Sequence, residues 1–559
     1  MMSIENPTRM NVFDRGSFKE LNEDDDESDA SSVLPPLGSR NAKWWYSAYH
    51  NIAAIVGAGV LGLPTTMVYL GWGAGVVVLV MSWVITLFTL WQLVQMHEMK
   101  DENGNMKRFD TYYQLGQKAF GPKRGLWIVL PQQIVVQVGT DIVYMLTGGT
   151  AIWQFYQLLN CPDINPVAVG AEDQCCGIIG RTTFIIFFAL FQLVFAQLGN
   201  FNSIASLSLL ASVTSVCYCT IAWADSLHFG ISNHKGFSDP TKNITVCPTS
   251  YRMSHDRTDI VPHNSWADQV FGVFSALGVI AFAYAGHNVV LEIQSTLPST
   301  SKNPSKIRMW RGVVVAYIVV AICYFPVAFV GYWAFGTDLA VRGTSPGNPR
   351  SGNILLQLSE PKGLIAAANF LVAIHVTGSY QVYAMPMFEL LEKILVNKFR
   401  FRPTPQGRTS MMRIVTRSTY VVFTAFIAIT FPFFSDLLAF VGGFALTPTT
   451  YFLPCIIWLR LKKPRPFSIS WLVNWALIVI GVLLLLAATI GGMRNIIVDS
   501  STRQHFDYLN CTNTLDYPQQ CKLVNVPSAR SKYTFYGGWT CDHSSNSTYP
   551  TCKVHFQDA

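Results

Sequence analysis

Charged residues are scarce in this sequence. Asp, Glu, Lys and Arg make up 13% of its 559 residues, whereas hydrophobic residues make up 50%. Soluble globular domains carry about 25% charged residues. The shortage of charge excludes an ordinary soluble protein and indicates a chain that crosses a lipid bilayer several times.

The motifs of common enzyme chemistry are absent as well. The sequence has no Walker loop, no Gly-x-Ser-x-Gly turn and no His-Glu-x-x-His helix. Its formal net charge of +7 comes from basic residues in short clusters between apolar runs, which is typical of membrane topology rather than of nucleic-acid binding. We therefore predict no enzyme, no cofactor, no metal site and no nucleic-acid partner.

Long apolar runs dominate what is present. A bilayer core about 30 Å thick needs about 20 apolar residues per helix. Eleven such runs occur, at residues 46–71, 74–97, 126–159, 180–199, 202–226, 266–293, 309–335, 363–394, 412–431, 436–459 and 470–493. The first run lacks a cleavage site and follows a long polar stretch, so it is no signal peptide.

The chain divides into three predicted parts. Residues 1–42 contain an acidic stretch without apolar periodicity, and we expect a disordered cytoplasmic tail there. Residues 43–495 form the transmembrane domain. Residues 496–559 hold four cysteines and several aromatic residues, which predicts a small disulfide-stapled module outside the cell.

Basic residues and cysteines give the same orientation. The basic clusters between spans lie on the side that holds the N-terminus, which places that side in the cytoplasm and the C-terminus outside. Three N-x-[ST] sequons fall in the outer segments, at Asn243, Asn510 and Asn546. Eight cysteines also fall there and are disulfide candidates: Cys161, Cys175, Cys176, Cys247, Cys511, Cys521, Cys541 and Cys552. The last four allow three pairings.

The first span is predicted to be a broken helix. Its segment NIAAIVGAGVLGLP holds three glycines and a proline within an apolar run. Unwound backbone inside a membrane is tolerated only where it faces a cavity lined by protein. Unwinding at Gly57 and Gly59 exposes N–H donors at the positive end of the following half-helix, which suits a carboxylate. Glycines that only pack helices are the alternative.

A second break is predicted in the sixth span. The segment IAFAYAGHNVVLEIQ holds small residues and a polar group at mid-span, and it opens the second set of five helices as the first break opens the first set. Corresponding breaks in two halves indicate an inverted-repeat transporter. The eleventh span would then be peripheral.

Ionisable residues inside the spans are candidates for proton coupling, because such groups are costly in a membrane and usually face a cavity. On the third span, Gln137, Asp141 and Tyr144 share one helical face by their spacing of four and three. The coupling candidates are Asp141, His287, Glu292 and His375. Each has a structural alternative: the histidines as hydrogen-bonded packing residues, and Glu292 neutralised by Arg311 or the interface. Weaker pocket candidates are Tyr380, Tyr383, Thr447 and Thr449.

Several of these segments resemble one family. The runs YSAYHNIAAIVGAGVLGLP, GHNVVLEIQSTLPST, GSYQVYAMPMFELLE and FPFFSDLLAFVGGFALTPTTYFLP are similar to plant lysine/histidine-type transporters of the amino acid/auxin permease family. The resemblance covers roughly residues 38–498. It implies an all-α membrane fold of the bacterial leucine transporter type, with eleven helices in a 5+5 inverted repeat, and proton-coupled uptake of amino acids across the plasma membrane.

The resemblance also implies roles for both breaks. Residues Ile55, Val56, Gly57, Ala58 and Gly59 would bind the substrate carboxylate, and residues Phe282, Ala283, Tyr284, Ala285 and Gly286 would bind its ammonium group and side chain. Gln137 stands where similar transporters tend to carry an acid, and Gln137 and Tyr144 complete the predicted pocket. A channel, an amino acid receptor and a carrier of an amino-acid-like acid such as auxin remain alternatives. A partner for the C-terminal module is unknown.

Overall fold

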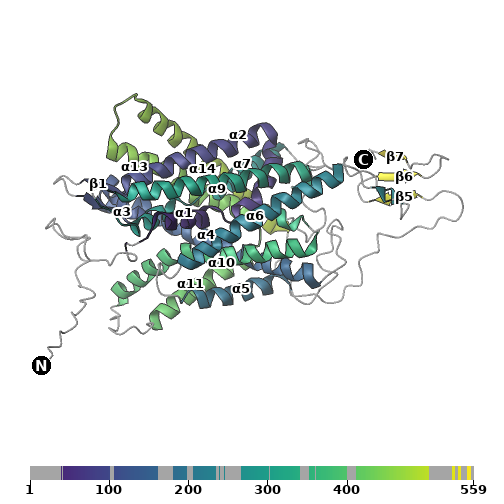
Figure 1. The fold of residues 1–559 in the computed structure, drawn as a ribbon, viewed down its shortest axis with the longest axis horizontal. Helices are drawn as coiled ribbons and strands as arrows, with labels where there is room; N and C mark the ends of the chain where they lie inside the picture. The colour runs from purple at the N-terminus through teal and green to yellow at the C-terminus, as the bar shows by residue number, and fades with distance from the viewer. Residues whose placement is uncertain are drawn as a thin grey trace.

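The helices of the protein, seen in a computed structural model, coincide with the apolar runs of its sequence and pack in one bundle (Figure 1). The structure describes residues 40, 42–100, 106–160, 180–197, 205–234, 238–239, 244–245, 266–300, 303–339, 352–358, 361–399, 411–502, 532–535, 539–542 and 551–554. The α-helices there are α1 (Trp44–Ile55), α2 (Gly59–Met96), α3 (Tyr112–Phe120), α4 (Pro122–Asn160), α5 (Arg181–Phe195), α6 (Ala205–His234), α7 (Trp266–Ala283), α8 (His287–Ser295), α9 (Ser305–Phe335), α10 (Lys362–Phe399), α11 (Met411–Thr430), α12 (Phe434–Phe440), α13 (Leu453–Lys462) and α14 (Ile469–Thr502).

Eight spans of the described chain are long and apolar enough to cross a membrane, or nine if the bent pair that includes α12 and α13 counts as one span. Helix α2 covers the end of the first predicted span and nearly all of the second. Gly71, with a φ of 71°, forms a kink that separates the two parts. Helices α1 and α5, with 12 and 15 residues, account for the rest of the first span and for the fourth. The prediction of an all-α membrane fold is confirmed.

Strands are few and short. Strands β1 (Glu98–Lys100) and β2 (Met106–Arg108) form an antiparallel hairpin between α2 and α3. We call the end of the bundle that carries this hairpin, together with α3 and α13, the hairpin end (Figure 1). Strands β3 (Ser238–Asp239) and β4 (Ile244–Thr245) pair with each other. Strands β5 (Lys532–Phe535), β6 (Trp539–Asp542) and β7 (Thr551–Val554) form an antiparallel sheet in that order.

Two helix breaks lie against each other in the buried core. Helix α1 ends at Ile55 and α2 begins at Gly59, whereas α7 ends at Ala283 and α8 begins at His287. Gly286 has a φ of 155°, a conformation that favours glycine, and an added Cβ would lie 2.8 Å from Ile55 Cγ1. A Cβ on Gly59 would lie 2.7 Å from Ala283 Cα. The backbone at both predicted breaks is therefore unwound, and glycine lets the two segments touch.

The tenth span contains a further irregularity. Two π-helical turns, η8 (Val441–Leu446) and η9 (Pro448–Phe452), separate α12 from α13. The span bends by 42° at this point. π-helical turns inside membrane helices often mark functional sites.

Several sequence predictions fall outside the described residues. They concern the acidic N-terminal tail, the three sequons and six of the eight outer cysteines, namely Asn243, Asn510, Asn546, Cys161, Cys175, Cys176, Cys247, Cys511 and Cys521. The domain boundaries at residues 42 and 495 likewise stay predictions.

Candidate functional site

The first break leaves backbone donors without partners. Val56 N–H still donates to the Ile52 carbonyl, at 2.8 Å. The N–H groups of Gly57 and Ala58 make no hydrogen bond to any described residue. They precede α2, whose N-terminus carries the positive end of the helix dipole. This segment is therefore suited to bind an anion such as a carboxylate.

The carbonyl groups around the same break are occupied. Side-chain hydroxyls from α6, α9 and α10 donate to four of them. The pairs are Ser379 Oγ to Ala53 O at 3.0 Å, Tyr383 Oη to Ala54 O at 3.0 Å, Tyr324 Oη to Ile55 O at 2.6 Å and Tyr218 Oη to Gly57 O at 3.1 Å. These bonds satisfy the last carbonyls of α1 and fix the shape of the break.

A small cavity lies between the two breaks. It has a volume of about 10 Å³, the room for roughly one water molecule. An amino acid therefore enters only if the walls move apart. The lining residues are Ala54, Ile55, Gly57, Thr140, Tyr144, Phe282, Ala285, Tyr383 and Leu446.

The sequence predicted part of this lining. Ile55, Gly57, Tyr144, Phe282 and Ala285 belong to the predicted pocket, and Tyr383 was a weaker candidate. Ala54, Thr140 and Leu446 were missed. The Gly-Gly pair and the Thr-Pro step around Leu446 were the sequence signals for the π-helical turns of the tenth span.

Asp141 is buried and does not belong to the residues that line the cavity. Tyr420 Oη donates to Asp141 Oδ2 at 2.7 Å, which links α4 to α11. The other carboxyl oxygen has no hydrogen-bond partner, and no ion pair to Asp141 is found, among the described residues. An ionised carboxylate is costly in such surroundings. Gln137, one turn earlier, is also buried, and its amide nitrogen has no described partner.

The two candidate histidines have different surroundings. His287 Nε2 lies 3.0 Å from the Thr86 carbonyl and 3.0 Å from Thr89 Oγ1, both on α2. His375 Nδ1 lies 2.8 Å from the Ala211 carbonyl, and its Nε2 lies 3.2 Å from Ser379 Oγ. Because Ser379 also bonds Ala53, only His375 is connected to the first break through a hydrogen-bonded neighbour.

Glu292 belongs to a different group of residues. It is buried on α8, and Gln133 Nε2 on α4 donates to its Oε1 at 3.3 Å. Neither Glu292 nor Gln133 lines the cavity, so Glu292 does not contribute to its walls.

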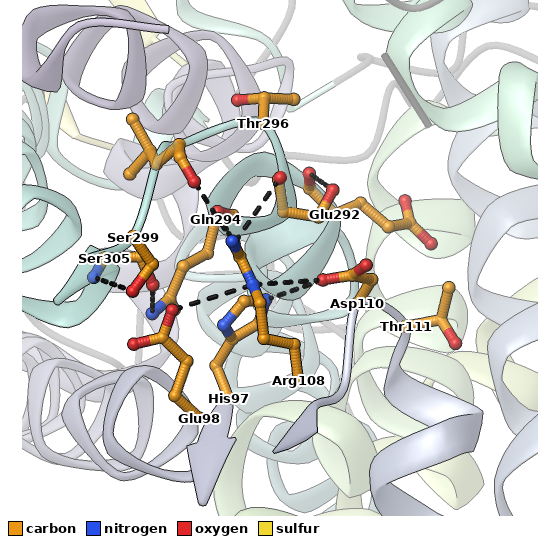
Figure 2. A network of polar contacts seen from close by, with 12 residues as sticks. His97, Glu98, Arg108, Asp110, Thr111, Glu292, Gln294, Thr296, Ser299 and Ser305 are labelled. Carbon is orange, nitrogen blue, oxygen red and sulfur yellow. Dashed lines mark hydrogen bonds and ion pairs between the residues drawn. The ribbon is translucent and has the colours of Figure 1, made fainter. Parts of the chain in front are cut away.

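A charged network at the hairpin end connects the β1–β2 hairpin to α8, the helix that follows the second break (Figure 2). Arg108 Nη2 donates to the carbonyls of Gln294 and Leu297, each at 3.2 Å, at the C-terminus of α8. Arg108 Nε lies 3.6 Å from Glu98 Oε1 and 3.7 Å from Asp110 Oδ1. The guanidinium therefore stabilises the negative end of the α8 dipole while its own charge is compensated.

Asp110 holds the same network together. It lies 3.3 Å from His97 Nε2 and 3.3 Å from Arg40 Nη2, on the segment that precedes α1. Burial lowers the pKa of His97. Burial raises the pKa of Asp110, but contact with His97 and the charges of His97, Arg108 and Arg40 outweigh burial, so that pKa lies below its usual range.

The C-terminal sheet brings two of the candidate disulfide cysteines opposite each other. In the antiparallel register of β6 and β7, Cys541 stands directly opposite Cys552. Opposed residues on neighbouring antiparallel strands have Cα atoms about 4.5–5.5 Å apart, which is within the range that a disulfide bridges.

The chain is similar to proteins of known class over most of its length. The family model described as "transmembrane amino acid transporter protein" matches residues 40–494. Lysine histidine transporter-like 6 of Arabidopsis thaliana is 49% identical over 464 residues, which are 83% of this chain and 93% of that protein. Amino acid permease 6 of the same plant is 29% identical over 82% of this chain and 91% of that protein.

Similar solved structures are more distant. That of MhsT in complex with L-phenylalanine has 12% identity and a TM-score of 0.46, over 84% of this chain and 100% of the other. That of the Eremococcus coleocola manganese transporter has 15% identity and a TM-score of 0.44, over 82% of this chain and 87% of the other.

Proposed function

Because the chain belongs to the transmembrane amino acid transporter family, whose members are carriers and not enzymes, we propose that it takes up amino acids together with protons by alternating access. The observation that carries this proposal is the small cavity lined by both helix breaks. A site between two broken spans is the arrangement that binds substrate in carriers built from repeats.

The two breaks fit the two ends of a zwitterion. The unpaired N–H groups of Gly57 and Ala58 suit the carboxylate. The second break presents the C-terminus of α7 at Ala283, whose carbonyl dipoles suit an ammonium group. Tyr144 and Phe282 would then contact the substrate side chain, because both line the cavity. A carrier of this kind selects amino acids through their common backbone groups.

Proton coupling is assigned to His375, on the basis of hydrogen counting. The Ala211 carbonyl only accepts, so His375 Nδ1 carries a hydrogen. In the neutral ring Nε2 is then an acceptor, and the single hydrogen of Ser379 is shared between Nε2 and the Ala53 carbonyl. A second proton on His375 removes this competition, because Nε2–H then donates to Ser379 Oγ while Ser379 donates to Ala53.

A proton on His375 therefore completes the hydrogen bonds at the end of α1. The first break is fixed when the proton is bound and loosened when it leaves. Because the substrate carboxylate binds at the same break, protonation of His375 and substrate binding stabilise the same structural element. Asp141 is the alternative proton site. Asp141 does not line the cavity and is bonded to Tyr420, so we assign it the role of a neutral structural carboxyl group instead.

We further propose the plasma membrane as the location, with the N-terminus and the hairpin end in the cytoplasm. The basic residues of the hairpin end support this orientation. The sequons at Asn243, Asn510 and Asn546 would then carry glycans. The register of β6 and β7 favours a Cys541–Cys552 disulfide.

Uptake in oocytes tests the function. Cells that express the protein should show saturable inward currents with neutral amino acids, larger at acidic external pH, and uninjected cells should not. A protonophore should abolish accumulation of a labelled amino acid. Flux that ignores the proton gradient overturns symport, and a current that rises linearly without saturation indicates a channel. Competition by an auxin-like acid would identify the alternative substrate.

A further inference from the structure

One buried hydroxyl lies between the two breaks. Tyr324 on α9 is fully buried, and its Oη lies 2.6 Å from the Ile55 carbonyl and 2.7 Å from the Ala283 carbonyl. Ile55 is the last residue of α1, and Ala283 is the last residue of α7. The phenol oxygen therefore touches the C-terminal ends of both half-helices at once.

The hydrogens and acceptors at this point do not balance. A tyrosine hydroxyl has one hydrogen, whereas both neighbours are carbonyl oxygens that only accept. One of the two short oxygen–oxygen contacts is therefore made without a hydrogen. Both carbonyls also lie at helix C-termini, where the dipoles are negative. Three oxygens in a buried position thus favour a positively charged group beside them.

We propose that Tyr324 is a positioning residue, which holds the Ile55 and Ala283 carbonyls together as a joint acceptor for the substrate's ammonium group. Ile55 lines the cavity, and so do Phe282 and Ala285 on either side of Ala283. Each carbonyl has a second lone pair that is free to accept from an ammonium N–H while Tyr324 keeps the two breaks in register. The inference rests on the proposed amino acid uptake.

The chain offers two matched controls. Tyr218 is equally buried, but its hydroxyl bonds only the first break, at Gly57. Tyr317 lies two turns before Tyr324 on α9 and is also buried, but its hydroxyl makes no hydrogen bond to either break among the described residues. Replacement by Phe removes one oxygen in each case. The three variants therefore distinguish a hydroxyl that bonds both breaks (Tyr324) from one that bonds the first break alone (Tyr218) and from a buried tyrosine that bonds neither break (Tyr317).

The test compares Tyr324→Phe, Tyr218→Phe and Tyr317→Phe at matched surface abundance. Uptake of the amino acid that the wild type prefers gives KM and maximal rate. Competition by the same amino acid and by the 2-hydroxy acid with the same side chain measures recognition of the ammonium group. We expect Tyr324→Phe to raise KM about tenfold, because the two carbonyls are no longer held at the spacing that binds the ammonium group, and to reduce the preference for the amino acid by a similar factor.

Tyr218→Phe should keep that preference, and Tyr317→Phe should match the wild type. If Tyr324→Phe reaches the surface but shows no uptake, thermal stabilisation of the purified variant by the two ligands gives the same ratio. An unchanged preference in Tyr324→Phe, or an equal loss in Tyr218→Phe, overturns the role of Tyr324. Absence of wild-type uptake would instead refute the proposed function.

Discussion

Adding one methyl group at Gly59 should uncouple the two breaks. The new Cβ would lie 2.7 Å from Ala283 Cα and 3.1 Å from Ala283 N. Ordinary van der Waals contact begins at 3.4 Å, so the two backbones must separate by about 0.7 Å. No rotamer change relieves this contact, because the atoms that it meets are backbone atoms and the Cβ of an alanine, which has no rotamers. Tyr324 fixes both segments, so the displacement also stretches its two short contacts.

The expected loss follows from that displacement. Overpacking a buried site costs about 1–3 kcal/mol, and misplacing reacting or binding groups by about 1 Å costs up to about 100-fold in rate. Gly59→Ala should therefore lower uptake by about 10- to 100-fold, with surface abundance near that of the wild type. Initial rates of labelled amino acid uptake, divided by surface-biotinylated protein, measure the effect.

Gly57→Ala is the matched comparison, because its Cβ meets a side chain instead. That Cβ would lie 2.7 Å from Tyr144 Oη, whereas the nearest ring carbons are 3.3 and 3.4 Å away. Tyr144→Phe removes only the close oxygen, so the double variant should regain uptake relative to Gly57→Ala alone. The same second change should not rescue Gly59→Ala. Normal uptake by Gly59→Ala, or a double variant no better than Gly57→Ala, would refute this reasoning.

Four other variants test the buried and charged groups. His375→Gln should abolish the stimulation of uptake by external acid, whereas Asp141→Asn should retain it; the opposite result would make Asp141 the proton site. Arg108→Met should lower the melting temperature of the purified protein by several degrees. It removes the hydrogen bonds from the charged guanidinium to the carbonyls of Gln294 and Leu297, which are worth about 2–3 kcal/mol. An unchanged melting temperature would contradict the conclusion that Arg108 caps α8. Burial lowers the folded pKa of His97 below 6.5, so its contribution to stability is present above pH 6.5 and is lost as the pH falls below that value. His97→Gln should flatten the dependence of stability on pH below 6.5, and an unaltered slope would exclude His97 as its source.

The sequence predicted those parts of the fold that local composition controls. Apolar runs of about 20 residues located the helices, because only a helix satisfies its backbone in a bilayer. Glycine clusters located both breaks, since residues such as Gly286 and Gly59 occupy positions where a side chain is strained or excluded. Both signals lie within a few neighbouring residues and are readable without tertiary contacts.

Contacts between distant residues were not predictable in this way. Tyr324 and Ile55 are separated by 269 positions, and Ser379 and Ala53 by 326. A tyrosine in an apolar run looks like packing until its acceptor is known. Helical spacing predicted that Asp141 and Tyr144 share one face of α4, but only Tyr144 of the two lines the cavity, whereas Asp141 is bonded to Tyr420. Spacing defines a face of a helix and does not define which neighbour that face meets.

Arg108 contributes both to the predicted membrane topology and to the stability of α8. In the sequence it is one of several basic residues that predict which side of the membrane a loop occupies. In the structure its guanidinium caps α8 and is compensated by Glu98 and Asp110. The two roles agree with each other: a basic residue at the hairpin end stabilises the negative end of α8, and under the proposed orientation that end is the side where basic residues accumulate. The topological signal therefore also marks where the second half of a broken span is anchored.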